Sequence, residues 1–191
     1  MIQKIVFYTK KFLNNIVFDK KFTFLDIGCG NGWVARKMAQ IPTCKQAIGI
    51  DKSKNMIEKA KMKKVSKKEK YFQTELESWK NTGKFNVVFS MESLYYSVPM
   101  EPALAKVYTI LKPNGVFYCG TDFYSDNHLT TRWAKDMKIP MDLRSKSQWR
   151  KMFEKMGFTT RTKQVKDPTH KSKWKREYGT LFVIGKKQSV D

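Results

Sequence analysis

The sequence predicts an α/β protein built on a mostly parallel sheet with helices on both faces. Short β-rich apolar runs alternate along the chain with segments whose apolar residues recur at helical spacing. The first β-rich run also leads directly into a glycine-rich turn that opens a helix, as at a nucleotide-cofactor site. No Pro-, Gly- or Ser-rich linker divides the 191 residues, so we expect a single domain over 1–191.

The amino-terminal half alternates regularly between helices and strands. Apolar residues at helical spacing predict an amphipathic helix over 1–20, and a core follows over 22–191. Ser53 is the expected N-cap of one helix. The other expected elements, in order, are a strand at 22–27, a helix from Asn31 to before Pro42, a strand at 45–50, a helix after Ser53 and a strand at 70–73.

The carboxyl-terminal half continues the pattern with one irregular insert, at about 122–145. Ser145 and Gln148 have the spacing of a capping box for the helix that Gly157 closes. The other expected elements are a strand at 85–90, a helix over 103–111, a turn at 112–115, a strand at 116–121 and two final strands at about 158–165 and 178–184.

The glycine turn is the most informative motif. Gly28, Gly30 and Gly32 alternate with other residues and allow a tight turn and a close approach to a ligand. Asp26 stands two residues before the first glycine, and Asp51 follows the next β-rich run, where a carboxylate can accept both ribose hydroxyls. The glycines follow G-x-G-x-G, which is not the G-x-G-x-x-G of dinucleotide enzymes.

In these residues the chain resembles the class I S-adenosylmethionine-dependent methyltransferases, from about Phe22 to the carboxyl terminus. The resemblance implies a Rossmann-like, doubly wound sheet of seven strands in the order 3-2-1-4-5-7-6, with strand 7 antiparallel. It implies S-adenosyl-L-methionine as cofactor and S-adenosyl-L-homocysteine as product.

The same resemblance assigns cofactor-binding roles residue by residue. Glu75 stands where many members have Asp, so it departs from the family pattern, and an ordinary surface carboxylate is the alternative interpretation. For Met56 the alternative is a core methionine. The implied binding residues are Asp26, Gly28, Gly30 and Gly32 for the methionine part, Asp51 for the ribose, Met56, Glu75 and Leu76 for the adenosine, and Ser90 and Met91 near the sulfonium.

The acceptor site is expected in the segments that follow strands 85–90, 116–121 and 158–165, because ligands bind outside the carboxyl ends of the strands in this fold. Carboxylates, phenols and an imidazole gather there, although the aromatic residues could instead cap the core. The candidate proton acceptors are Glu92, Asp122 and His128, which the sequence does not rank, and the candidate substrate contacts are Tyr95, Tyr96, Tyr124 and Asn127.

The absence of motifs typical of other methyltransferase groups narrows the class of acceptor. The residues Ser90-Met91-Glu92-Ser93 stand where amino-directed nucleobase enzymes have [DN]-P-P-[FY], and neither a Pro-Cys pair nor a double-Glu loop is present. The pattern favours a small organic acceptor. The net charge of +21 keeps RNA or protein substrates open, but only six of the 38 basic residues are Arg. A non-catalytic cofactor-binding regulator is a further alternative.

The segment 166–176 mixes basic and aromatic residues more densely than any other part of the chain. A solvated hairpin loop between the last two strands is the simpler interpretation. The alternative is that four basic residues steer an anionic acceptor toward the sulfonium, with Trp174 packed over it. Those four residues are Lys171, Lys173, Lys175 and Arg176.

Cysteines and apolar segments set the remaining expectations. Cys29, Cys44 and Cys119 lack metal-ligand spacing, so we expect packed, reduced thiols and no metal site. No apolar run is long enough to span a membrane, and lysines interrupt the amino-terminal residues, so we expect a cytoplasmic protein without a signal peptide. The oligomeric state stays open.

Overall fold

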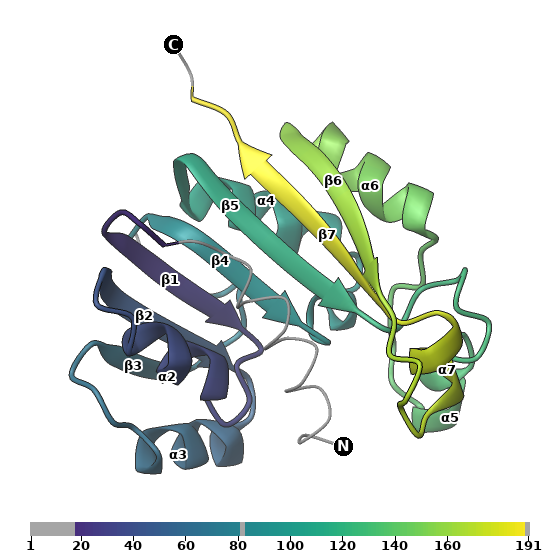
Figure 1. Cartoon of the computed structure of the whole chain (residues 1–191), viewed down its shortest axis with the longest axis horizontal. Coiled ribbons are helices and arrows are strands. Elements are labelled where there is room, and N and C mark those ends of the chain that lie inside the picture. Colours follow the sequence, from purple (N-terminus) through teal and green to yellow (C-terminus); the bar gives the residue numbers. More distant parts are fainter. Residues whose placement is uncertain (1–17, 81–82, 190–191) are drawn as a thin grey trace.

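In the computed structural model of the protein, residues 18–80 and 83–189 are described, and they form one sheet of seven strands (Figure 1). The strand order is β3-β2-β1-β4-β5-β7-β6, and β7 runs antiparallel to both of its neighbours. The order and the antiparallel strand that the resemblance implied are confirmed. The helix expected over 1–20 falls almost wholly outside the described residues.

The bounds of the elements follow the predicted alternation. The strands are β1 (Phe22–Ile27), β2 (Cys44–Asp51), β3 (Glu69–Gln73), β4 (Phe85–Met91), β5 (Leu111–Thr121), β6 (Phe158–Val165) and β7 (Thr180–Lys187). The helices are α2 (Trp33–Ala39), α3 (Lys54–Met62), the 3-10 turn η1 (Leu94–Tyr96), α4 (Glu101–Ile110), α5 (Trp133–Met137), α6 (Lys146–Lys155) and α7 (Lys173–Glu177).

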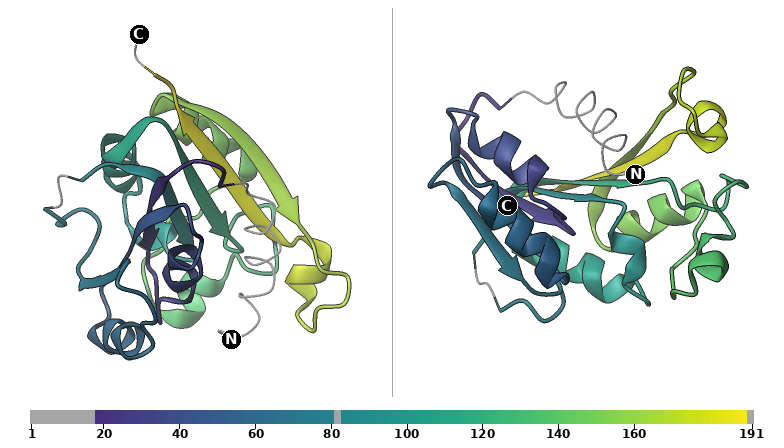
Figure 2. Two further views of the ribbon diagram at one scale, coloured as in Figure 1. Left: turned by 60° about the vertical axis from the view of Figure 1, so that its left-hand side comes forward. Right: turned by 90° about the horizontal axis from the view of Figure 1, so that it is seen from below.

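Two apolar clusters cover the two faces of the sheet, because successive strand residues point to opposite sides. Phe24 belongs to the cluster that α2 and α3 cover, and Leu25 belongs to the cluster that α4 and α6 cover. Both side chains are completely buried. Figure 2 shows the resulting layers, with helices on either side of a twisted sheet.

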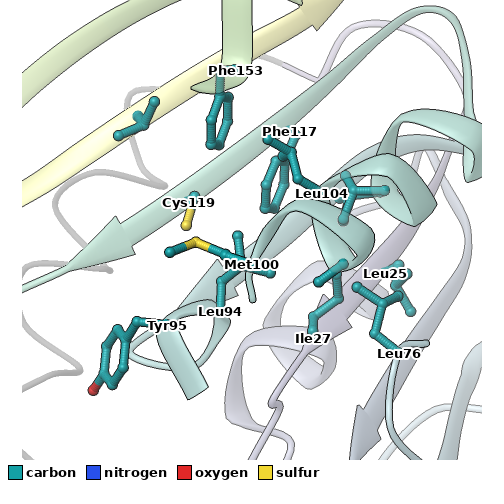
Figure 3. Packing of buried hydrophobic residues seen from close by; sticks show 14 of the residues in the cluster. Leu25, Ile27, Leu76, Leu94, Tyr95, Met100, Leu104, Phe117, Cys119 and Phe153 are labelled. Carbon is teal, nitrogen blue, oxygen red and sulfur yellow. The ribbon is translucent and has the colours of Figure 1, made fainter. Parts of the chain in front are cut away.

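The cluster under α4 and α6 extends to the carboxyl edge of the sheet. Phe117 and Phe153 stack with ring centroids 5.4 Å apart in its centre. Tyr95 belongs to the same cluster, and its hydroxyl oxygen points away from the other labelled side chains (Figure 3). The core therefore anchors a phenol whose polar end is presented at the edge where the strands finish.

The predicted helix signals are confirmed. The Ser53 side chain accepts from the Met56 backbone N–H, and Ser145 and Gln148 form the reciprocal capping box. Gly157 has a φ of 94°, which favours glycine, and it ends the segment of α6. These local signals set where α3 and α6 begin and therefore which faces they bury.

The largest differences from the sequence predictions are the starts of two strands and two short helices that were not expected. β5 begins at Leu111, directly after α4, and the 112–115 turn is an irregularity inside this strand pairing. β7 starts at Thr180, two residues later than expected. The insert at 122–145 contains the short helix α5, and the connection expected as a plain loop contains α7. Short helices held by tertiary contacts give little periodic signal.

The capping box generates a stability prediction. Replacing Ser145 by Ala should lower the free energy of unfolding by about 1 kcal/mol, because the Gln148 N–H in the first turn of α6 loses its side-chain acceptor. Urea denaturation measures the change. The matched control is Ser172→Ala, since the Ser172 side chain makes no cap hydrogen bond in the described part of the chain. Equal losses in both variants would contradict the assigned role of the capping box.

Candidate functional site

The glycine turn after β1 has the backbone geometry that only glycine adopts readily. Gly28, Gly30 and Gly32 have φ angles of 67°, 52° and 74°. A Cβ on Gly28 would collide with Ser93, and one on Gly32 would collide with the Tyr71 ring. A Cβ on Gly30 would instead enter open space, with nothing within 4 Å among the described residues. Gly28 and Gly32 therefore allow packing, whereas Gly30 leaves its space to a ligand.

Asp51, at the end of β2, is held beside this turn. One carboxylate oxygen accepts from the Gly30 N–H at 2.9 Å, and the other accepts from the Ser53 N–H at 2.8 Å. Both oxygens keep further lone pairs for a ligand. The carboxylate therefore fixes the turn between β1 and α2 against the end of β2 and remains able to accept hydroxyl groups.

The larger of the two cavities at this edge has a volume of about 470 Å³, which is the size of a small-molecule site. The ends of β1, β2, β3 and β4 and the η1 segment all contribute to its walls. Asp51 and Lys52, its neighbour in the chain, both line this cavity. The other lining residues are Ile27, Gly28, Ile50, Thr74, Glu75, Leu76, Glu77, Glu92, Ser93, Leu94, Tyr96, Ser97 and Val98.

A smaller cavity of about 150 Å³ lies on the other side of the turn, and Gly28 borders both cavities. Its lining residues are Asp26, Gly28, Cys29, Gly30, Asn31, Trp33, Val34, Met56, Phe89 and Met91. Most of the predicted cofactor residues thus line one of the two cavities. Gly32 and Ser90 line neither of them; Gly32 is buried against Tyr71, and Ser90 is buried at the end of β4.

Three buried polar atoms near the glycine turn have no protein partner, and two of them belong to residues that line the smaller cavity. Asp26 Oδ2, Asn31 Oδ1 and Ser90 Oγ make no hydrogen bond within the described residues. Burial raises the pKa of the Asp26 carboxyl well above its ordinary value, and nearby Asp51 adds to the rise. A buried acceptor set of this kind is costly unless a donor reaches it. A bound ammonium group would supply that donor, so these residues fit the methionine part of S-adenosylmethionine.

Glu92, the residue after β4, is held in a strained backbone conformation with a φ of 54°. Its Oε1 accepts from the Asp122 N–H at 2.6 Å, and its Oε2 accepts from the Tyr95 hydroxyl at 3.1 Å. Burial raises the pKa of this carboxyl to about 8, and the charge of Asp122 contributes to the rise. Since Glu92 also lines the larger cavity, a proton-exchanging group with a pKa near neutrality faces the ligand space.

Asp122, the residue after β5, faces a different environment. Its carboxylate forms a buried ion pair with Lys175 of α7, and Oδ1 accepts from the Thr180 hydroxyl at 2.7 Å. Its backbone carbonyl accepts from Asn127 and Thr130. Asp122 is only 3% exposed and lines neither cavity. Of these two predicted proton acceptors, Glu92 therefore reaches a cavity and Asp122 does not.

The other predicted acceptor-site residues are only partly brought together. Tyr96 lines the larger cavity, whereas Tyr95 is buried and contacts Glu92. The Tyr124 hydroxyl is buried and donates to the Tyr178 carbonyl. Asn127 is buried below Asp122. His128 is exposed and packs edge-on against the Tyr178 ring, outside both cavities.

The structure corrects one part of the steering hypothesis. Lys175 is 3% exposed, and its ammonium group contacts Asp122 and the Thr180 hydroxyl, so it is not available to a solvent-borne anion. Trp174 packs against Trp133 with ring centroids 5.6 Å apart. Lys171, Lys173 and Arg176 are exposed, as expected. A lysine within a basic run carries no sequence signal that would mark it as buried.

Sequence reasoning also missed several lining residues. Ser93, next to Glu92, packs against the glycine turn, and Lys52, next to Asp51, lies with its ammonium nitrogen 5.8 Å from the Tyr96 ring centroid. Val98 is 54% exposed at the cavity wall. The first two adjoin predicted site residues, which was the available signal. Nothing in the residue type or spacing of Val98 points to a site.

The remaining expectations concern thiols, metals and membranes. Cys29, Cys44 and Cys119 are buried and unbridged, and burial raises the pKa of each thiol. Within residues 18–80 and 83–189, no cluster of three or more His, Cys, Asp or Glu side chains could hold a metal ion. Over the same residues, no helix has the length and apolar character needed to cross a bilayer.

The sheet order, the glycine turn and the two cavities at the carboxyl edge define a class I methyltransferase fold with a nucleotide-cofactor site. The profile of the methyltransferase domain family matches residues 4–163. The chain belongs to this family, the class I S-adenosylmethionine-dependent methyltransferases. The cofactor is S-adenosyl-L-methionine.

Known relatives match over part of their length. The ubiquinone biosynthesis O-methyltransferase of Pelagibacter ubique is 33% identical over 104 residues, which are 53% of this chain and 42% of that protein. The Saccharomyces cerevisiae sterol 24-C-methyltransferase is 30% identical over 54% of this chain and 29% of its own length. This chain thus spans less than half of either relative.

Solved structures share the fold at low sequence identity. A chain from the complex between the Haloferax volcanii Trm112 methyltransferase activator and a protein described as a methyltransferase has a TM-score of 0.87 at 21% identity, covering 95% of this chain and 89% of that one. The N-methyltransferase NodS of Bradyrhizobium japonicum, solved with S-adenosyl-L-homocysteine, has a TM-score of 0.69 at 19% identity, over 87% and 78% of the two chains.

The Asp51 geometry generates a binding prediction. Asp51→Ala should weaken S-adenosylmethionine binding by about 2–3 kcal/mol, because the variant loses a charged acceptor and the group that fixes the Gly30 N–H. Isothermal calorimetry measures the affinity. Glu58→Ala, at an exposed position of α3, is the matched control and should bind as the wild type does. Unchanged affinity in Asp51→Ala would remove Asp51 from the site, and comparable affinity for NADH would contradict the cofactor assignment.

The raised pKa of Glu92 generates a stability prediction. Because the folded protein disfavours the charged carboxylate, ionisation of Glu92 should destabilise the wild type as the pH rises from the unfolded pKa of about 4.5 to the folded pKa of about 8. The free energy of unfolding of Glu92→Gln should therefore gain about 2 kcal/mol on the wild type over that range, with partial exposure reducing the full linkage value.

Urea denaturation at several pH values tests this, with Glu58→Gln as the exposed control. A difference between Glu92→Gln and the wild type that does not vary with pH would show that Glu92 ionises equally easily in both states.

Proposed function

We propose that this protein transfers the methyl group of S-adenosylmethionine to a small organic acceptor that carries a hydroxyl or amine, with Glu92 as proton acceptor. The observation that carries the proposal is the position of Glu92, on the wall of the larger cavity and one residue from Ser93, which packs on the cofactor turn. Glu92 therefore shares one cavity with the predicted cofactor residue Asp51 and with Tyr96.

The charge of the cavity supports a small acceptor over a nucleic acid. Among the described lining residues, four acidic side chains accompany one ammonium group. A polyanion brought to this edge would meet net negative charge, whereas a cationic cofactor is attracted. The lining also favours an uncharged acceptor over an anionic one. Those five lining residues are Asp51, Glu75, Glu77, Glu92 and Lys52.

The chemistry asks little of the protein beyond alignment and proton removal. Bound S-adenosylmethionine supplies an activated methyl group on a sulfonium. The cavity walls position the acceptor oxygen or nitrogen and limit water. Glu92 in its carboxylate form accepts the proton that the acceptor loses while the acceptor atom bonds to the methyl carbon, and the electron pair of the broken S–C bond stays on sulfur. Neutral S-adenosylhomocysteine and a protonated Glu92 result.

Glu92 is preferred to the other two candidate proton acceptors because it lines the larger cavity. Asp122 is buried in its pair with Lys175, and His128 lies outside both cavities. The Tyr95 hydroxyl supports Glu92 by donating to Oε2, which is the kind of hydrogen bond that orients a general base. Tyr95 is therefore a positioning residue, and Tyr96 is the phenol that can touch an acceptor.

The experiment supplies methyl-labelled S-adenosylmethionine to the protein with fractionated metabolite, RNA and protein extracts. Label should enter the small-molecule fraction, and Glu92→Gln should lower the transfer rate about 10²–10⁴-fold while cofactor affinity stays within a factor of a few. The wild-type rate should rise with pH through about 8, because Glu92 must be ionised to accept a proton. His128→Ala is the matched control and should keep most of the rate.

Three outcomes would contradict the proposal. Label in RNA or protein alone would replace the small acceptor by a macromolecule. Tight cofactor binding with no transfer to any fraction would favour a regulator that retains the cofactor pocket without turnover. Equal losses in Glu92→Gln and His128→Ala would remove Glu92 as the particular base.

A further inference from the structure

A network of buried polar side chains connects the acceptor side of the site to the β6–β7 connection. Lys175 of α7 contacts the Asp122 carboxylate, and both groups bond to the Thr180 hydroxyl at the start of β7. The side chains of Lys175 and Asp122 are only 4% and 5% exposed. The Asp122 backbone N–H continues the network to Glu92.

Burial of the two charged groups is unfavourable unless each has close partners. Removing an ammonium and a carboxylate from water costs several kcal/mol for each ion, and only close pairing with further hydrogen bonds offsets the cost. Here both ions have further partners: the Thr180 hydroxyl bonds to the Lys175 ammonium group and to the Asp122 carboxylate, and Asn127 and Thr130 donate to the Asp122 carbonyl. The pair is therefore a built feature and not a chance contact between surface charges.

The helix α7 is the element that delivers the lysine. It lies beyond the carboxyl end of β5 (Figure 1), in the connection between the two antiparallel strands. The Gly179 N–H closes the helix by donating to the Trp174 carbonyl at 2.7 Å, and Trp174 packs on Trp133 of α5. The chain thus fixes α7 on both sides of Lys175, and the lysine side chain is directed inward while its neighbours Lys173 and Arg176 are exposed.

We propose that Lys175 is a positioning residue of the acceptor site: it holds Asp122 in a buried ion pair and thereby leaves Glu92 as the one carboxyl group of this network that exchanges a proton with the acceptor. This inference rests on the proposed function of Glu92. The Asp122 backbone N–H bonds to the Glu92 carboxyl group, which brings two acidic side chains close together, and two such groups repel each other when both are ionised. With Lys175 in place, Asp122 pairs with the lysine and Glu92 exchanges the proton.

Each element packed against Glu92 contributes a charged or titratable group. The end of β5 contributes Asp122 and Cys119, the η1 segment contributes Tyr95 and Tyr96, and α7 contributes Lys175. The charge of Asp122 raises the pKa of Glu92, and the charge of Lys175 lowers it. Removing either charged side chain should therefore move the titration of Glu92, in opposite directions.

The test is a carboxyl ¹³C NMR titration of the full chain bound to S-adenosylhomocysteine, with labelled glutamate and with Glu92→Gln to assign the signal. Lys175→Met should raise the midpoint of Glu92 by about one pH unit, and Asp122→Asn should lower it by a similar amount. The double variant Asp122→Asn/Lys175→Met should fall between the two single variants. Lys135→Met, which removes an exposed charge from the neighbouring helix α5, should leave the midpoint unchanged.

The comparison of Asp122→Asn with the double variant isolates the Lys175 charge even if Lys175→Met does not fold, because no unpaired buried carboxylate remains in either protein. Equal midpoints in those two proteins would overturn the proposal and reduce Lys175 to a stabilising contact. The readout needs no acceptor, so a failure to find transfer would contradict the proposed function without changing these midpoints.

Discussion

The site depends on the two hydrogen bonds that the Asp51 carboxylate accepts from the Gly30 and Ser53 N–H groups. They join the turn after β1 to the first residues after β2, so two strand ends share one charged group. Because β1 lies between β2 and β4 in the sheet, this connection sets the position of both cavities. Gly28 then lies between the cavities, and the Ser93 side chain lies against it.

Much of the architecture could be predicted because local and global signals agree. The alternation of periodicities, the Ser53 cap and the Ser145–Gln148 box are all local, and the sheet order followed from the resemblance. The side chains of the acceptor half were harder to place. Tyr124 and Tyr96 look equivalent in the sequence, yet one is buried against the β6–β7 connection and the other lines a cavity. Contacts with residues far away in the sequence decide which tyrosine is buried, and the spacing of residues along the chain gives no information about such contacts.

The buried ion pair illustrates the same limit. A lysine in a run of exposed lysines carries no mark of burial, and α7 is too short to show a periodic pattern. Its orientation follows from the closure of the helix at Gly179 and from the contact between Trp174 and Trp133. The net charge of +21 is also a poor guide to the site itself, because the larger cavity has four acidic lining residues and one basic one. Surface charge and site charge have opposite signs in this molecule.

The place of β7 between β5 and β6 has a consequence for synthesis on the ribosome. One edge of β5 stays unpaired until β7 has emerged. The strand that pairs with this edge is β7, and β6, which is made before β7, does not pair with β5. The Thr180 hydroxyl and the lysine of α7 emerge only in that final stage, so the buried network around Asp122 is completed last. The cofactor half, from β1 to β4, leaves the tunnel much earlier. A nascent chain thus gains its nucleotide-binding turn before the groups that surround the base.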